Sequence, residues 1–176
     1  MKTFFIAISL AVLICFSARA GDDGRPEDSV LLERDQANDG GRPYWPIYAK
    51  KMTEIAISPP AGPGTHKLSI KSYSWVQCWK DGSHITADGD GPGEDRCVAP
   101  KLRLHSLIVK FKRYIKQPGG STSVIQTDWM QAGESSVVEC PYGPNEHAVI
   151  ILLCNDHSDG FWDNSGWWHV TFDWIK

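Results

Sequence analysis

The sequence predicts an all-β protein built as an antiparallel β-sandwich, on the basis of three observations. Short segments alternate apolar and polar residues, as a strand with one buried face does. The 176 residues include 16 Gly and 11 Pro, which recur between these segments and indicate frequent turns. No segment combines the apolar period of a helix with capping residues. Short strands joined by many turns are typical of sandwiches.

Several stretches carry the strand pattern, and loops separate them. Residues 68–79 alternate after a loop rich in Pro and Gly, and the Gly-rich segment 80–96 follows as a long loop. Further strands are expected at residues 102–115, 123–130, 136–140, 147–154 and 167–175. The two segments 136–140 and 147–154 are expected to form a hairpin around turn residues 141–145.

The N-terminal residues have the features of a secretory signal peptide. Lys2 supplies the positive start, residues 4–16 are almost wholly apolar, and Ala18-Arg19-Ala20 is a small-residue cleavage site. We therefore expect residues 1–20 to be removed and the protein to be secreted and extracellular. Residues 21–43 are acidic and Gly-rich, which predicts a flexible tail or a pro-segment. Residues 44–176 then form a single domain.

The charge balance restricts the class of partner. Cleavage removes one Lys and one Arg, so Lys plus Arg falls from 18 to 16 while Asp plus Glu stays at 21, giving a net charge of −5. A negative net charge argues against nucleic acid or an anionic membrane as the ligand. No segment after residue 20 is long and apolar enough to span a membrane. A neutral ligand or an extracellular protein fits this balance.

The cysteines predict disulfides. Cys78, Cys97, Cys140 and Cys154 remain after cleavage, and an even number in a secreted chain indicates two bonds with three possible pairings. The pairing of Cys78 with Cys97 and of Cys140 with Cys154 is favoured because each closes a short loop. Zinc is the alternative, but the spacings lack C-x-x-C and a close His pair, so no metal is expected.

Two other polar patterns are interpreted as ordinary surface. Asp88-Gly89-Asp90-Gly91 is predicted to be a solvated turn, with calcium as the alternative, because the oxygen-ligand spacing of a calcium loop is missing. The six His residues are scattered and are each expected at the surface.

No nucleophile, zinc-protease or phosphate-binding motif is present, and no pair of carboxylates is placed as in a glycosidase. We therefore expect neither catalysis nor a cofactor.

The segment 154–170 carries the functional signal. It places three of the eight Trp residues, including Trp162 and Trp167, beside Asp, Asn and Gly. Flat rings that stack on a sugar, next to short polar side chains, are what a sugar-binding surface needs; the alternative is that these rings are core. In residues 167–175 the side chains alternate, with Trp168, Val170, Phe172 and Trp174 on one face. If that face is buried, Trp162 and Trp167 remain at the surface.

The same segment resembles a known family. Starch-binding carbohydrate-binding modules end in a segment similar to the run Asp159-Gly160-Phe161-Trp162-Asp163-Asn164 followed by Trp168-His169-Val170. Residues 107–130 contain a strand, a Gly-rich loop and a Trp in the same order as the first strand, loop and Trp of these modules. The resemblance covers residues 101–176 and implies an immunoglobulin-like sandwich, with residues 44–100 as a candidate N-terminal extension. It further implies that Trp162 is a stacking platform, Trp129 a second ring and Asn164 a hydroxyl contact. Asp163 is expected to brace the turn.

Together these observations predict a secreted, non-catalytic protein that binds a polysaccharide or other glycan through exposed Trp residues. The alternative is a secreted, disulfide-bonded interaction protein, such as an effector, a toxin-like protein or a receptor-binding factor, with no sugar ligand. The two classes differ in whether Trp162 and Trp167 are exposed.

Overall fold

The computed structural model describes residues 30–31, 37–39, 42–58, 64–78, 82–143 and 146–175. The expected signal peptide, its Cys15 and most of the expected acidic tail lie outside the described residues. Among the described residues, no helix has the length and apolar character that crossing a membrane requires.

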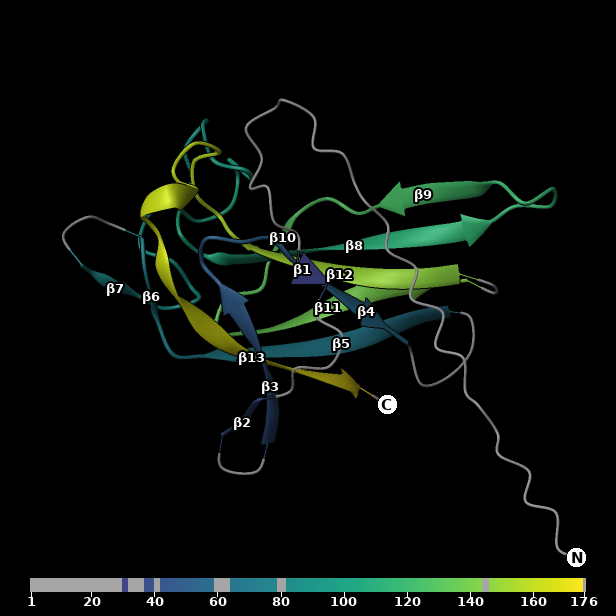
Figure 1. Cartoon of the computed structure of the whole chain (residues 1–176), viewed down its shortest axis with the longest axis horizontal. Helices are drawn as coiled ribbons and strands as arrows, with labels where there is room; N and C mark the ends of the chain where they lie inside the picture. Colours follow the sequence, from purple (N-terminus) through teal and green to yellow (C-terminus); the bar gives the residue numbers. More distant parts are fainter. Residues whose placement is uncertain are drawn as a thin grey trace, which may run out of the picture.

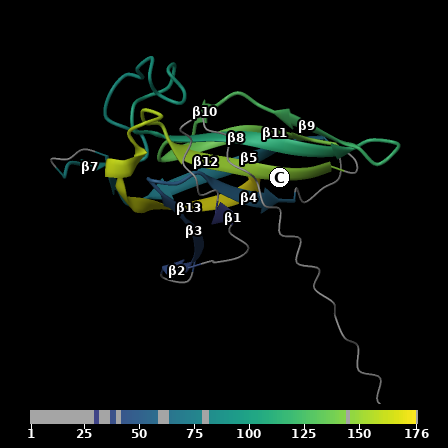
Figure 2. The same cartoon turned by 45° about the horizontal axis from the view of Figure 1, so that its top comes forward.

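The described chain is all-β and forms two sheets that pack on one another in a sandwich-like arrangement (Figures 1 and 2). In order, its elements are β1 (Val30–Leu31), β2 (Ala37–Asp39), β3 (Arg42–Tyr48), β4 (Thr53–Ile57), β5 (Gly64–Tyr73), β6 (Val76–Gln77), β7 (His84–Ile85), β8 (Leu107–Lys116), β9 (Thr122–Gln126), β10 (Met130–Gln131), β11 (Ser135–Tyr142), β12 (Glu146–Cys154), the 3-10 helix η1 (Phe161–Asp163) and β13 (Ser165–Ile175).

The first sheet has the order β1-β4-β12-β8-β10, with β9 added along β8. The second sheet has the order β11-β5-β13-β3-β2, and β6 joins it by pairing with β13. All pairings are antiparallel apart from the short contact between β1 and β4, among the strands described. The all-β prediction is confirmed, whereas the immunoglobulin-like type implied by the resemblance stays a prediction.

Strands β12 and β13 occupy the centres of the two sheets and show the two ways in which a strand is buried. Residues 148–154 of β12 are apolar without alternation and all buried, because β4 and β8 flank the strand. Strand β13 alternates instead: Trp168 and Val170 are fully buried in the core, and Phe172 and Trp174 pack against it. The predicted faces of residues 167–175 are therefore confirmed.

The predicted hairpin at residues 136–154 is wrong in its pairing. Strands form on both sides of the turn, as expected, but β11 pairs with β5 in the second sheet while β12 pairs with β4 and β8 in the first. The chain therefore crosses from one sheet to the other at this point. Strand β12 carries an uninterrupted apolar run, which suits the centre of a sheet better than one arm of an isolated hairpin.

One end of the sandwich is covered by two packed loops, residues 86–106 and 154–160, which we call the loop layer (Figure 1). Asn155 joins them: its side-chain oxygen accepts from the backbone N–H of Ala99, and its amide donates to the carbonyls of Ala99 and Leu102. A second link is the bridge between Cys97 and His157. Hydrogen bonds to residues more than 50 positions away in the sequence thus hold the segment 86–106 in place.

The expected solvated turn at Asp88–Gly91 lies within this layer, and its two Asp residues are exposed. The backbone of the turn also packs against the backbone of residues 104–106. Gly89 has a φ of +76°, and a Cβ there would overlap the carbonyl oxygen of Leu104. Leu104 also donates its backbone N–H to the carbonyl of Gly91 at 3.0 Å. The Gly residues therefore permit a close backbone approach, which the composition of the loop alone does not reveal.

Candidate functional site

Aromatic side chains gather on the outward side of the second sheet. Strand β13 lies between β3 and β5, and its outward residues alternate with the buried ones. In this register Trp167 is opposite Tyr48 of β3, and His169 is opposite Tyr73 of β5. Tyr44 of β3 stacks on His169 from the same side. We call these five residues (Tyr44, Tyr48, Tyr73, Trp167 and His169) the aromatic face.

Contacts between the rings fix their orientation. The rings of Tyr44 and His169 are stacked with centroids 4.0 Å apart, and those of Trp167 and His169 are near-parallel at 6.4 Å. The indole N–H of Trp167 donates to Nε2 of His169 at 2.9 Å, while Tyr48 lies tilted against Trp167 at 5.8 Å. The row is therefore ordered before any ligand arrives, which reduces the entropy lost on binding.

The exposed part of these rings is what a ligand would meet. Tyr73 is 51% exposed, Trp167 44% and Tyr48 41%. Trp162, in η1 directly before β13, is 66% exposed. The expectation that Trp162 and Trp167 stay near the surface when Trp168 is buried is therefore met.

The other sequence-predicted residues are placed differently. Asn164 is fully buried, and its amide donates to the carbonyl of Ala49 at 3.2 Å, so its side chain ties the start of β13 to the end of β3. Asp163 is half-buried in η1. Trp129 precedes β10 at the edge of the first sheet, where it packs partly on the core with Lys110 Nζ 4.6 Å from its ring centroid. The structure thus brings Trp167, but not Trp129, into the aromatic face.

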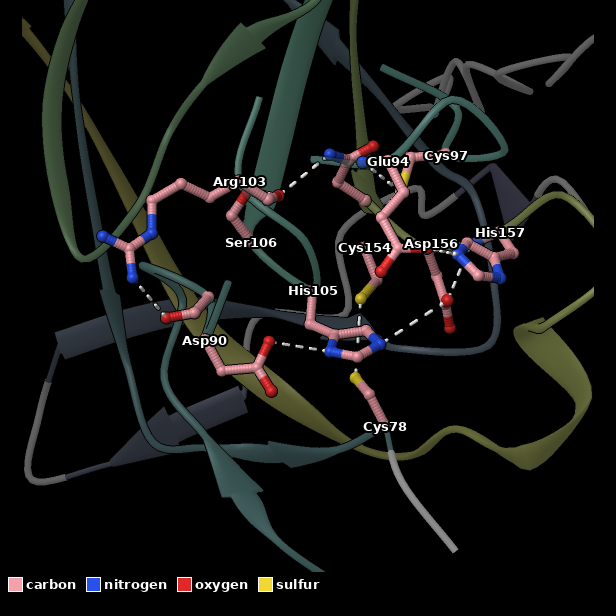
Figure 3. A network of polar contacts seen from close by, with 12 residues as sticks. Cys78, Asp90, Glu94, Cys97, Arg103, His105, Ser106, Cys154, Asp156 and His157 are labelled. Atoms are coloured by element: carbon pink, nitrogen blue, oxygen red, sulfur yellow. Dashed lines mark hydrogen bonds and ion pairs between the residues drawn. The ribbon is translucent and has the colours of Figure 1, made fainter. Parts of the chain in front are cut away.

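An ionic cluster lies within the loop layer, around the buried His105 (Figure 3). His105 is 2% exposed, and its Nδ1 is 2.9 Å from Asp90 Oδ1 while its Nε2 is 3.6 Å from Asp156 Oδ1. Its backbone has a φ of 54°, in the left-handed region, and its N–H donates to the carbonyl of Asn155. The expectation that every His lies at the surface is wrong here. Its two carboxylate partners, one 15 and one 51 residues away, stabilise it inside the protein.

The electrostatics of this cluster hold a charged pair together. Burial by itself would lower the pKa of His105, but the hydrogen bonds to Asp156 and Asp90 outweigh it and raise the pKa to about 9. Burial would likewise raise the pKa of Asp156, yet hydrogen bonds from the His105 ring and from the His157 backbone N–H lower it. His105 is therefore a cation at neutral pH that donates to Asp90 and forms an ion pair with Asp156.

More exposed pairs fasten the outside of the loop layer. His157 Nε2 lies 3.0 Å from Glu94 Oε2, and Arg96 donates to Asp159 at 2.6 Å. Both pairs join residues 86–106 to residues 154–160. Within the described ranges, no group of three or more His, Cys, Asp or Glu side chains is arranged to hold a metal ion. The ionic groups of this layer therefore pair with one another.

The cysteine prediction needs a correction. All four described Cys residues are buried free thiols, so the expected bonds Cys78–Cys97 and Cys140–Cys154 are not present. Cys78 instead lies beside Cys154, with their sulfur atoms 3.6 Å apart. The expected pairing relied on short loops, whereas the fold brings together residues that are 76 positions apart.

Sequence reasoning missed Tyr44, Tyr48 and Tyr73. The signal that they share is the alternation of β3 and β5, but their role appears only when β3 and β5 are paired with β13. Compared with known proteins, the chain matches no family model, and no curated protein gives a significant match.

Proposed function

We propose that the protein is a secreted, non-catalytic carbohydrate-binding protein that engages a polysaccharide through Trp162 and the aromatic face. The observation that carries the proposal is the row of ordered rings on β3 and β13, with the exposed Tyr73 of β5 beside it. The features of a signal peptide at residues 1–20 support secretion.

The chemistry of the face suits a neutral sugar. The C–H face of a pyranose stacks on an aromatic ring, and the analogous stacking of a nucleic-acid base is worth roughly 1–3 kcal/mol per ring; a sugar lies near the lower end. Tyr hydroxyls at the rim supply hydrogen-bond donors and acceptors. A few such contacts give weak binding to one short oligosaccharide. Repeated sites on a polymer raise the retention through effective concentration, so an insoluble polysaccharide is the expected target.

Two of the residues named from the sequence, Asn164 and Trp129, have structural roles in this proposal. Asn164 braces the turn that presents Trp162 and Trp167, because its side chain is buried and bound to Ala49. Trp129 is assigned to the packing of the first sheet rather than to the ligand.

The test is retention on insoluble polysaccharides, with starch granules, cellulose and chitin as the three probes. We expect the wild-type chain to bind one of them. Trp162→Ala and Trp167→Ala should each lower the bound fraction, and the double variant should abolish binding while its far-UV circular dichroism stays unchanged. Trp129→Ala removes the same side chain from the other sheet and is the matched control, with retention expected at the wild-type level.

A titration of soluble α-glucans, β-glucans and chitin oligomers, followed by Trp fluorescence, separates the two classes of function. A shift with one glycan class supports the proposal. If the wild-type chain binds none of the soluble and insoluble glycans, the proposal is wrong. The aromatic face is then assigned to a protein interface, where Tyr and Trp are also enriched. Full retention by the double variant would also refute the assigned site.

A further inference from the structure

We propose that Cys78 and Cys154 form an intramolecular disulfide that joins the two sheets at the end of the sandwich carrying η1. The two sulfur atoms are 3.6 Å apart, and the contact is buried (Figure 3). A disulfide sets its sulfur atoms about 2.05 Å apart. The closure therefore requires the sulfurs to approach by about 1.5 Å.

The position of each residue explains why this pair matters. Cys78 directly follows β6, which pairs with the start of β13 in the second sheet. Cys154 is the last residue of β12, the central strand of the first sheet. The bond would therefore cross between the sheets, next to the segment that leads into η1 and Trp162. It would close a loop between residues 76 positions apart, and long loops gain most from such a constraint on the unfolded chain.

The other two Cys residues have different surroundings. Cys97 Sγ accepts the backbone N–H of Glu94 at 3.4 Å. Cys140 Sγ lies 4.0 Å from the carbonyl oxygen of Pro141, on a strand that pairs with β5. Among the described residues, Cys78 and Cys154 are the only Cys pair whose sulfur atoms are in contact. Cys97 and Cys140 are therefore expected to remain thiols.

The oxidant is a donor disulfide, either oxidised glutathione or the active-site disulfide of a thiol–disulfide oxidoreductase. One thiolate of the pair attacks the donor disulfide, forms a mixed disulfide and releases the first donor thiol. The second thiolate then attacks the sulfur bound to the donor and displaces the second donor thiol. The pair loses two electrons and two protons, and the donor disulfide gains both.

Burial determines when the bond forms and how it behaves. Burial raises the pKa of the Cys154 thiol well above its ordinary value, so the attacking thiolate is disfavoured once the protein has folded. We therefore expect oxidation during folding, before the core closes. Cys78 is 2% exposed and Cys154 is fully buried, so the finished bond is shielded from external reductants.

Peptide mapping of the full chain tests the pairing. The chain is refolded in a mixture of reduced and oxidised glutathione, alkylated, digested without reduction and analysed by mass spectrometry. The expected result is one linked peptide pair containing Cys78 and Cys154, with Cys97 and Cys140 recovered alkylated. Recovery of Cys78 and Cys154 both as alkylated thiols, or a link from either one to Cys97 or Cys140, would overturn the proposal.

Thermal unfolding supplies a second readout. The refolded wild-type chain should melt at a higher temperature than the same chain that has been reduced in denaturant and refolded with a reductant present. The double variant Cys78→Ser and Cys154→Ser should show no such response, while Cys97→Ala and Cys140→Ala should each keep it. A response that disappears in the Cys97 or Cys140 variant would contradict the assignment. The mapping decides the question on the wild-type chain even if the double variant does not fold.

Discussion

The indole nitrogen of Trp167 and Nε2 of His169, two outward residues of β13, are joined by a hydrogen bond of 2.9 Å. The bond holds the Trp167 ring against the row formed by His169 and Tyr44. His169 is thus a positioning residue for the exposed indole, and this relationship leads to a direct prediction.

If the proposed function holds, replacement of His169 by Ala should weaken binding to the polysaccharide. The indole stays in place but loses its acceptor and its neighbouring ring, so more conformational freedom is lost on binding. The expected loss of affinity is up to roughly tenfold. Depletion isotherms on the insoluble polysaccharide measure it. Asp173→Ala, at an exposed position of the same strand outside the aromatic face, is the control. Equal affinity of His169→Ala and the wild type would show that Trp167 does not need this support.

The stability of the protein should fall in alkaline solution because of His105. Its pKa in the folded state, about 9, is higher than its ordinary value of 6.5. The stabilising contribution is therefore complete below about pH 6.5 and is lost as the pH rises through about 9, to the order of 3 kcal/mol. Urea unfolding at a series of pH values measures this loss. In the variant His105→Gln the free energy of unfolding should fall less between about pH 6.5 and 9 than in the wild type. The same dependence on pH in both proteins would contradict the prediction.

Asp156 should produce the opposite dependence at acid pH. Its pKa is lower in the folded protein than its ordinary value of 3.8, so its contribution is present above about pH 4 and is lost as the pH falls further. The same urea series, extended to acid pH, detects it. The variant Asp156→Asn should unfold with a shallower acid dependence than the wild type. Asp159→Asn, an exposed partner of Arg96, provides the comparison.

Asn155→Ala should destabilise the protein by roughly 2–4 kcal/mol. The substitution removes the buried amide that joins residues 99–103 to the end of β12 and leaves several backbone groups without their partner. Each buried polar group left in this way costs about 1–3 kcal/mol. Chemical unfolding gives the free energy, and hydrogen exchange should show the largest loss of protection in residues 86–106. A change below about 0.5 kcal/mol would mean that the loop layer does not depend on this side chain.

Gly89→Ala should destabilise the loop layer even though it adds a single methyl group. The residue has a φ of +76°, and its Cβ would overlap backbone atoms of Leu104 and Ser106, which cannot rotate away. We expect a loss of at least about 1 kcal/mol in chemical unfolding. Gly119→Ala is the matched control, since it has a φ of +102° but no atom within 4 Å of the added Cβ. Similar losses in both variants would assign the cost to the backbone angle alone.

The sequence allows the local part of this fold to be predicted and leaves the long-range part open. The two faces of residues 167–175 follow from the two-residue period of a strand and match β13. The hairpin at 136–154 could not be placed correctly, because turn residues indicate a change of direction but not which sheet receives each strand. For the same reason Tyr48 and Tyr73 could not be grouped with Trp167 before β3, β5 and β13 were paired.

The buried cluster shows a different limit. His105 has no acidic neighbour in its immediate sequence, and it is the meeting of residues 86–106 with residues 154–160 that surrounds it with Asp90 and Asp156. The proximity of Cys78 and Cys154 arises in the same way. Pairing rules based on short loops favour neighbours along the chain, whereas the folded protein selects neighbours in space.

The central place of β13 in the second sheet has a consequence for biosynthesis. Strands β3, β5 and β6 all hydrogen-bond to β13, yet they precede it by many residues. During translation these strands leave the ribosome without the partner that connects them, and their edges stay available to chaperones until residues 165–175 emerge. Nascent chains that stop before this point should therefore be aggregation-prone, and final folding should follow completion of the strand rather than proceed step by step from the N-terminus.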